Sequence, residues 1–259
     1  MGINSTRFFI DFDGTITKND IVDLILDRFA SNDWKKVEAE WVQGKIGSRE
    51  CLTRQIALVS ATKEDIIRLT AKAEIDSHFV SFLRRAKACG ISVAIVSDGF
   101  RVVIEEVLKR ALKASPELLH RLPIFSNQLE WANGLLSVCF PEGPACEHAC
   151  ANCKSRVIED HRTPDQKIIF IGDGLSDRFA AAASDLTFAK GGANGRSPLL
   201  KFCEENKINH EKYSSFKEIE TWLIRHSDRS EESKKRDPSS ASGVLRMTRS
   251  AGRYVVERN

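Results

Sequence analysis

The fold is decided by ten residues near the start of the chain, Phe8-Phe9-Ile10-Asp11-Phe12-Asp13-Gly14-Thr15-Ile16-Thr17. Their apolar beginning predicts a buried strand, and the Gly-Thr pair predicts a turn after it. Because strand side chains alternate between faces, Asp11 and Asp13 point to the same side. In an open α/β sheet, ligands bind at the carboxyl ends of the strands. We therefore expect both carboxyl groups to face a ligand.

Two further predicted strands end in polar side chains. Ser97 follows the β-branched run 91–96, and Asp173 and Asp177 follow the run 167–172. In a doubly wound sheet such ends converge with Asp11 and Asp13 on one crevice. Like charges this close together are costly unless a cation joins them. Asp oxygens without His suit Mg²⁺ rather than Zn²⁺, so we expect a magnesium site.

Four segments with helical spacing follow the first strand, at 20–30, 33–44, 48–60 and 62–75. None of them leads directly into a strand, which indicates an all-helical insertion. Beyond residue 77 strands alternate with helices, and Asn133-Gly134 predicts a hairpin. The predicted fold is α/β, a Rossmann-like doubly wound parallel sheet with an inserted all-helical cap and a small β-hairpin. We assign the core to 1–17 and 77–226, and the cap to 18–76.

Charge and composition narrow the class of protein. Eight of 39 Lys/Arg and five of 36 Asp/Glu lie from Ser227 onward, so residues 1–226 carry 31 of each. A neutral folded part argues against a nucleic-acid partner. The Ser/Lys/Arg/Glu-rich segment 227–259 is predicted to be a disordered tail. No apolar run approaches the roughly 20 residues that span a bilayer, so we expect no membrane partner and a cytoplasmic protein.

The seven cysteines are odd in number and come without a secretory signal, which argues against a disulfide framework. Cys146, Cys150 and Cys153 form a cluster, with His148 between them. These residues could gather around a structural Zn²⁺, with His148, Cys139 or water as the fourth ligand. Free or partly buried thiols fit the same spacing, and the sequence does not decide between the two.

Four motifs carry a family resemblance. Asp11-x-Asp13-Gly14-Thr15, Ser97 after an apolar strand, Lys154 before a helix, and Gly172-Asp173-x-x-x-Asp177 resemble, in order, the motifs of the haloacid dehalogenase-like phosphohydrolases. The helical insertion resembles the cap of the phosphoserine-phosphatase branch. The resemblance implies a Mg²⁺-dependent phosphomonoesterase acting on a small phosphorylated metabolite.

The same resemblance assigns roles to the first two acidic residues and their cofactor. Asp11 would attack phosphorus and form an aspartyl-phosphate. Asp13 would protonate the leaving alkoxide and then deprotonate the hydrolytic water. Mg²⁺ would be held by Asp11, the Asp13 main-chain carbonyl and Asp173.

The remaining motif residues would bind the phosphate or support the site. Ser97, Lys154 and the turn amides of Gly14 and Gly99 would bind phosphoryl oxygens, and Asp177 would orient Lys154 or a metal-bound water.

Within the branch, the chain resembles the methionine-salvage phosphatases that act on 2-hydroxy-3-keto-5-methylthiopentenyl-1-phosphate. The Asp-Phe-Asp-Gly-Thr-Ile-Thr opening and the cysteine-rich stretch before Lys154 carry this resemblance, whereas Gly174 and the loop 191–195 depart from it. Phosphoserine phosphatases place a Glu and an Arg where this chain has Asp20 and Gln55. Arg54 is one position away, which turns its side chain by about 100°.

Several alternatives therefore stay open. Phosphoserine could still be the substrate, and an inactive homologue that binds a phospho-ligand or a partner protein belongs to another class. Four cap residues could line an apolar substrate pocket, although they are more often core residues: Phe29, Trp34, Trp41 and Leu58.

Overall fold

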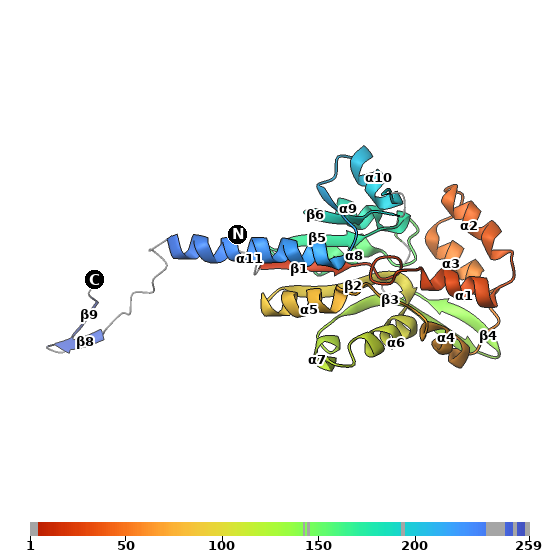
Figure 1. Ribbon diagram of the computed structural model, residues 1–259, viewed down its shortest axis with the longest axis horizontal. Coiled ribbons are helices and arrows are strands. Elements are labelled where there is room, and N and C mark those ends of the chain that lie inside the picture. The colour runs from red at the N-terminus through yellow and green to blue at the C-terminus, as the bar shows by residue number, and fades with distance from the viewer. Residues whose placement is uncertain are drawn as a thin grey trace.

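The computed structural model describes residues 5–141, 143, 146–192, 195–236, 247–250 and 253–256. In this described part, seven strands form one sheet in the order β4-β3-β2-β1-β5-β6-β7. They are β1 (Thr6–Ile10), β2 (Ser92–Phe100), β3 (Ile124–Ala132), β4 (Leu135–Cys139), β5 (Lys167–Gly172), β6 (Leu186–Lys190) and β7 (His210–Tyr213). Within this sheet, only β3 and β4 pair antiparallel. The predicted parallel sheet is confirmed, with the opening motif on its central strand (Figure 1).

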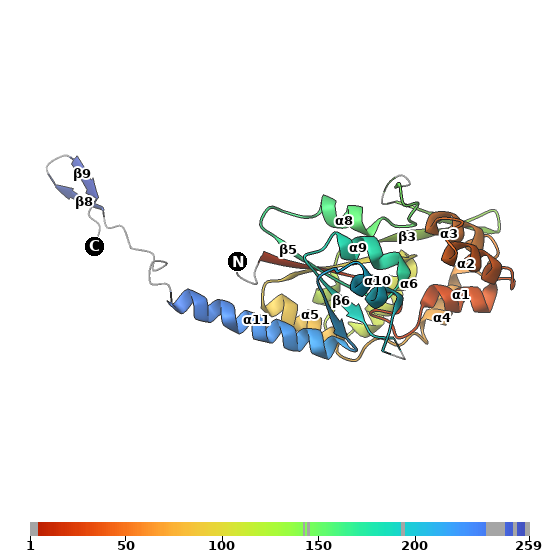
Figure 2. The ribbon, with the colours of Figure 1, turned by 90° about the horizontal axis from the view of Figure 1, so that it is seen from above.

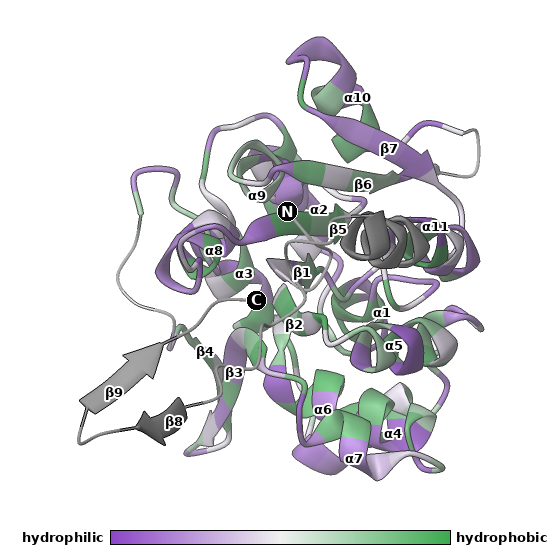
Figure 3. Ribbon diagram, turned by 90° about the vertical axis from the view of Figure 1, so that its left-hand side faces the viewer, coloured by the Kyte–Doolittle hydropathy of each residue, from purple (hydrophilic) through white to green (hydrophobic). Residues whose placement is uncertain are grey.

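The last three residues of strand β1 are apolar because helices cover both faces of the sheet. Phe8 and Ile10 pack on one face and Phe9 on the other, and none of the three is exposed to solvent. Hydrophobic residues accordingly gather on the central strands, whereas β7 at the edge is hydrophilic (Figure 3).

Helices cover the two faces in separate layers (Figure 2). Helices α5 (Phe79–Ala88), α6 (Arg101–Ala111) and α11 (Phe216–Arg236), with the short α7 (Pro116–Leu119), pack on the face of Phe8. Helices α8 (Lys154–Asp160), α9 (Arg178–Ala182) and α10 (Pro198–Glu205) pack on the face of Phe9, and the 3-10 turn η2 (Leu175–Asp177) precedes α9. The doubly wound arrangement is confirmed.

The cap consists of α1 (Ile21–Phe29), α2 (Trp34–Val42), α3 (Ser48–Ile56) and α4 (Lys63–Thr70), each inside a segment predicted to be helical. The four helices lie beyond the carboxyl ends of the strands (Figure 1). An antiparallel bridge between Thr17 and Ile75 joins the two chain crossings between cap and core. The division at 18–76 stays our assignment, and the helices fall within it.

Two elements differ from our expectation. Strand β7, of sequence His-Glu-Lys-Tyr, was not predicted, because only its pairing with β6 makes this polar segment a strand. Helix α11 continues to Arg236, past Ser227, where we expected disorder to begin. Of the rest of that tail, the structure describes only the hairpin of β8 (Met247–Ser250) and β9 (Arg253–Val256). Among the described residues, no helix is long and apolar enough to cross a membrane.

Candidate active site

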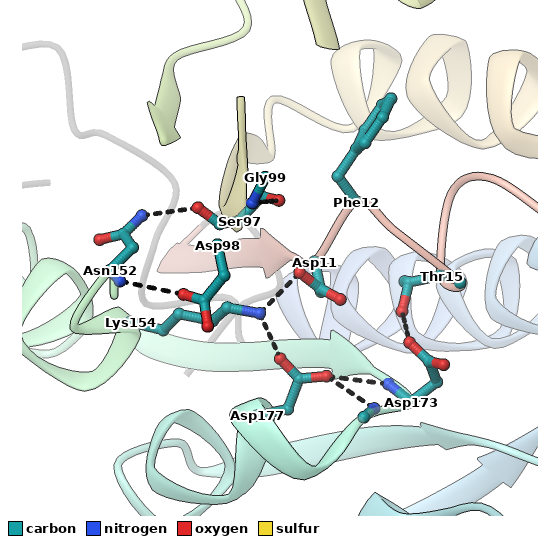
Figure 4. Close-up of polar contacts among 12 residues, drawn as sticks. Asp11, Phe12, Thr15, Ser97, Asp98, Gly99, Asn152, Lys154, Asp173 and Asp177 are labelled. Carbon is teal, nitrogen blue, oxygen red and sulfur yellow. Dashed lines mark hydrogen bonds and ion pairs between the residues drawn. The ribbon is translucent and has the colours of Figure 1, made fainter. Parts of the chain in front are cut away.

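Asp11 stands directly after the central strand, where its amide continues the ladder by donating to the Ile171 carbonyl at 2.9 Å. Its side chain is buried, and one carboxylate oxygen accepts a hydrogen bond from Lys154 Nζ at 2.6 Å (Figure 4). Burial, and then the charge of Asp177, raise the pKa of Asp11 well above its usual value, whereas Lys154 opposes the rise. The carboxylate is thus held in place by one cation in a poorly solvated site.

Asp13 takes a different position, under the start of the cap. Its Oδ1 accepts a hydrogen bond from the Ile21 amide at 2.9 Å. Burial, followed by the charge of Asp20, raises the pKa of the Asp13 carboxyl well above its usual value. A carboxyl group that tends to keep its proton is suited to general acid catalysis.

Two glycines allow the carboxyl groups to approach the backbone closely. Gly14 has φ of +72°, and a Cβ there would lie 2.5 Å from Asp173 Oδ2. A Cβ on Gly99 would lie 2.4 Å from Asp13 Oδ2. The amides that we expected to bind phosphate are engaged within the chain: Gly14 N donates to Thr17 Oγ1 at 3.1 Å, and Gly99 N donates to Ser97 Oγ at 2.9 Å.

Ser97 lies directly before an irregularity in the sheet. The register between β2 and β3 shifts between Ser97 and Phe100, so that Asp98 and Gly99 have no partners on β3. Ser97 is 1% exposed and lies at the carboxyl end of the regular ladder, beside the Asp11 strand. The Asn152 side-chain amide donates to the Ser97 carbonyl at 2.9 Å and fixes this end (Figure 4).

Lys154 joins two carboxylates at the centre of the site. Its Nζ lies 2.6 Å from Oδ1 of both Asp11 and Asp177. Burial alone would lower the lysine pKa, but Asp11 and Asp177 raise it well above its usual value. The second oxygen of Asp177 accepts from the amides of Asp173 and Gly174, each at 3.0 Å. Asp177 therefore connects Lys154 to the turn that carries Asp173.

The carboxylates suit a hard divalent cation. Asp11, Asp173 and Asp177 each place an oxygen within 4.8 Å of the others. Both oxygens of Asp177 already accept hydrogen bonds, so Asp11 and Asp173 are the better donors to a metal. Burial, and then the charge of Asp177, raise the pKa of the Asp173 carboxyl to about 6. Oxygen donors of this kind fit Mg²⁺.

The cap closes a cavity of about 990 Å³ over these residues. Of the predicted cap residues, Asp20 and Gln55 line it. Asp20 also caps α1 by accepting from the Asp23 amide at 3.0 Å, and Gln55 donates to Glu38 Oε2 at 2.9 Å.

All but one of the remaining cap predictions lie away from the cavity. Arg54 is not among the lining residues, because it pairs with Glu40 at 2.7 Å and Glu50 at 3.3 Å. Among the four candidates for an apolar lining, Trp41 lines the cavity, whereas Phe29, Trp34 and Leu58 belong to the hydrophobic core.

The cysteine cluster is assembled, but without its histidine. The sulfur atoms of Cys146, Cys150 and Cys153 lie within 4.8 Å of one another. The ring of His148 stacks on Phe179, with centroids 3.7 Å apart. Among the described residues, His148 therefore does not join the three sulfurs.

Three neighbours of the site were missed at the level of sequence. Thr15 Oγ1 donates to Asp173 Oδ1 at 2.7 Å, and Lys190 Nζ donates to the carbonyls of Gly14 and Thr15 at 2.6 and 3.1 Å. Asn152 fixes Ser97, as described above. Thr15 is the last residue of the first motif and Asn152 is two residues before Lys154, which was the available signal, whereas Lys190 at the end of β6 had none beyond its place at a strand end.

Comparison with known proteins agrees with this geometry. The family model of the haloacid dehalogenase-like hydrolases matches residues 8–182. The chain is 27% identical over 219 residues to a 2-hydroxy-3-keto-5-methylthiopentenyl-1-phosphate phosphatase of Bacillus mycoides (strain KBAB4), covering 83% of this chain and 94% of that protein. A Bacillus cereus (strain B4264) protein of the same name is 28% identical over 223 residues, covering 85% and 96%.

Solved structures share the fold. A phosphoserine phosphatase in the form of a phospho-aspartyl intermediate analogue matches with a TM-score of 0.62 and 21% identity, over 83% of this chain and 97% of that one. The phosphoserine phosphatase from T. onnurineus matches with a TM-score of 0.63 and 16% identity, over 86% and 97%. At these identities the likeness establishes the architecture of sheet and cap.

Proposed function

Because the chain belongs to the haloacid dehalogenase-like hydrolases and is a phosphatase, we propose that it hydrolyses a small phosphate monoester through an aspartyl-phosphate on Asp11. The observation that carries the proposal is the convergence of Asp11, Asp13, Asp173 and Lys154 in one buried cluster under the cap.

The first half-reaction follows from the two environments of Asp11 and Asp13. Lys154 holds one oxygen of Asp11, and the other attacks phosphorus as the bond to the leaving oxygen breaks. Asp13, whose pKa is raised, gives its proton to that oxygen, so the alcohol departs neutral. In the second half-reaction Asp13 takes a proton from water, which attacks phosphorus and releases inorganic phosphate and free Asp11.

Mg²⁺ is the cofactor that the donor set fits. Asp11, the Asp13 carbonyl and Asp173 would hold the ion, which when bound neutralises charge on the phosphoryl oxygens. Lys154 and Ser97 supply a cation and a hydroxyl to the same oxygens. Gly14 and Gly99 contribute chiefly by their lack of a side chain, since a Cβ at either would meet a site carboxylate.

The cap favours an ester with an uncharged tail over phosphoserine. Its lining includes Asp20, Asp23 and Glu38, which would repel the phosphoserine carboxylate, and Arg54 is turned away to Glu40. Trp41 and Leu52 offer apolar surface in the same wall. The relatives at 27–28% identity carry the name 2-hydroxy-3-keto-5-methylthiopentenyl-1-phosphate phosphatase, and we propose this ester as the substrate.

The covalent step is tested by comparing the wild type with Asp11→Asn on a generic aryl phosphate with Mg²⁺. We expect Asp11→Asn to abolish release of inorganic phosphate and binding of beryllium fluoride, because the amide cannot act as the nucleophile. The matched control Asp160→Asn changes an exposed carboxyl at the end of α8 and should keep both. Phosphate release by Asp11→Asn at the wild-type rate would refute the mechanism. No release by the wild type from any ester would favour an inactive phospho-ligand-binding homologue.

The substrate is tested by steady-state kinetics on a panel of esters. We expect kcat/KM for the methylthiopentenyl ester to exceed that for phosphoserine at least about tenfold, which corresponds to about 1.4 kcal/mol of transition-state binding. A preference for phosphoserine would contradict the assignment but leave the phosphatase chemistry intact.

A further inference from the structure

Three cysteines outside the phosphatase chemistry form a compact group of sulfur atoms. The sulfurs of Cys146, Cys150 and Cys153 lie within 4.8 Å of one another, and all are free thiols. In a tetrahedral zinc site with Zn–S bonds of about 2.3 Å, sulfurs lie about 3.8 Å apart. The three sulfurs are therefore close to the spacing that one metal ion requires.

The backbone around the first two cysteines is already turned toward such a site. The Ala149 amide donates to the Cys146 carbonyl at 2.9 Å, and Ala149 has φ of +50°, so the chain reverses between the cysteines. The Cys150 amide then lies 3.4 Å from Cys146 Sγ and donates to it. A donor aimed at sulfur favours the thiolate, which is the form that binds metal.

A positive charge lies beside the same loop. Arg49 Nε donates to the Cys150 carbonyl at 3.3 Å, and its Nη2 donates to the Gly143 carbonyl at 3.0 Å. Three thiolates and one Zn²⁺ carry a net charge of −1, which a neighbouring guanidinium offsets. Thiolate ligands also separate this group from the carboxylates around Asp11, because soft sulfur selects Zn²⁺ and hard oxygen selects Mg²⁺.

We propose that Cys146, Cys150 and Cys153 bind a structural Zn²⁺, with water in the fourth position. Neither of the protein ligands that we considered for that position joins the three sulfurs in the group of ligand atoms within 4.8 Å of one another, and His148 stacks on Phe179. The site is independent of the phosphatase chemistry in its ligands.

The metal would fix a loop that contacts both the cap and the site. On the cap side, the Arg49 amide donates to the Ala149 carbonyl at 3.1 Å, and the Ala151 amide donates to Ser48 Oγ at 2.8 Å. On the core side, the Asn152 amide donates to Asp98 Oδ1 at 3.0 Å, and Lys154 follows directly.

The last cysteine places the metal next to the lysine. Cys153 is the residue before α8, and Lys154 is the first residue of that helix. Tying Cys153 to the other two sulfurs limits how far the start of α8 can move. The zinc therefore acts as a positioning element for Lys154 and for the amino end of α3.

The proposal is tested by metal analysis of the full chain after dialysis in reducing buffer with excess Mg²⁺, which displaces zinc from carboxylate sites. We expect about one equivalent of zinc in the wild type. We expect less than about half an equivalent in Cys146→Ser, because a hydroxyl is a poorer zinc ligand than a thiolate. Cys89→Ser, outside the loop, and Asp173→Asn, in the other metal site, should both keep the zinc.

A second measurement does not depend on any variant. The number of cysteines in the native wild type that react with a thiol reagent should rise by about three when a strong zinc chelator is added. Replacement of zinc by Co²⁺ should produce a sulfur-to-cobalt charge-transfer absorption in the near ultraviolet.

Three results would overturn the site. They are zinc below about half an equivalent in the wild type, equal zinc in the wild type and a folded Cys146→Ser, or a disulfide between two of the three cysteines in protein isolated without air. Phosphatase activity enters none of these readouts, so the zinc proposal and the proposed function can fail separately.

Discussion

Lys154 Nζ lies 2.6 Å from Asp177 Oδ1, and the two side chains are only 3% and 0% exposed. Asp177 also accepts two amide hydrogens from the turn of Asp173, so one carboxylate sets the position of the lysine and of a metal-site residue. The pair links Lys154, for which we propose a role in binding phosphate, to the turn that carries Asp173.

Asp177→Asn should weaken both stability and turnover. The amide removes one of the two negative charges beside Lys154. Its NH₂ group cannot accept a hydrogen bond, so either Lys154 or the two backbone amides lose their acceptor. We expect the free energy of unfolding to fall by about 3 kcal/mol, since breaking a buried ion pair is costly. We expect kcat to fall by about 10²-fold because Lys154 is no longer aimed. Urea unfolding and steady-state kinetics measure the two effects, and a wild-type kcat in this variant would contradict the role.

Gly14→Ala and Gly44→Ala form a matched pair. Both glycines have φ of +72°, but a Cβ on Gly14 would meet Asp173 Oδ2 at 2.5 Å, whereas nothing lies within 4 Å of one on Gly44. Each variant should lose about 1–2 kcal/mol of stability from the left-handed conformation. Only Gly14→Ala should also require more Mg²⁺ for half-maximal activity, because Asp173 is displaced. Equal Mg²⁺ dependence in both variants would rule out that Gly14 is needed to leave room for the Asp173 carboxylate.

Arg54→Ala and Gln55→Ala should separate the two neighbouring cap residues. Arg54 is paired at the surface with Glu40 and Glu50, so its loss should change the stability little and kcat/KM less than about twofold. Gln55 is 4% exposed and lines the cavity, so its loss should raise KM about fivefold, as expected for one net hydrogen bond. A larger kinetic effect from Arg54→Ala would show that Arg54 reaches the substrate.

Asp23 should make stability depend on pH. Loss of solvation, and then the charges of Asp20, Glu38 and Asp27, raise its pKa to about 7 in the folded chain. The unfolded carboxyl titrates near 4, so between about pH 4 and pH 7 the folded chain binds the extra proton, and stability falls as the pH rises.

Asp23→Asn removes the titrating carboxyl and should flatten the dependence of stability on pH. We expect the variant to have a higher Tm than the wild type at pH 8 and nearly the same Tm at pH 4.5. The difference should be modest, because Asp23 is an exposed residue and solvent screens its charge. Melting curves across this range test the sign, and a lower Tm for the variant at pH 8 would contradict it.

The sequence was sufficient to predict those site residues that lie at the carboxyl ends of strands. Asp11, Ser97 and Asp173 each follow an apolar strand, and the parallel sheet brings them together without further information. Arg54 stayed a possible substrate contact at the level of sequence, although one residue turns a helix by about 100°, and the structure instead pairs it with Glu40 and Glu50.

Features that depend on tertiary pairing could not be predicted. The polar strand β7 exists through its register with β6, and the stacking of His148 on Phe179 joins segments that are distant in sequence. Lys190 reaches the Gly14 carbonyl across about 175 residues, and only the folded sheet places it there. Local patterns carry no signal for such partners.

The close approach of Gly47 to Ala149 has a consequence for substrate entry. A Cβ on Gly47 would lie 2.3 Å from the Ala149 Cβ, and the adjoining residues Ser48 and Arg49 bond the same loop. The cap is thus tethered at several places, because its chain crossings beside Thr17, the Ile21 amide and the carbonyls of Thr70 and Ala73 are also bonded to neighbouring segments. A lid held at several borders cannot swing widely about any one of them. We therefore expect an incoming ester to enter by small breathing motions of the cap rather than by a wide opening.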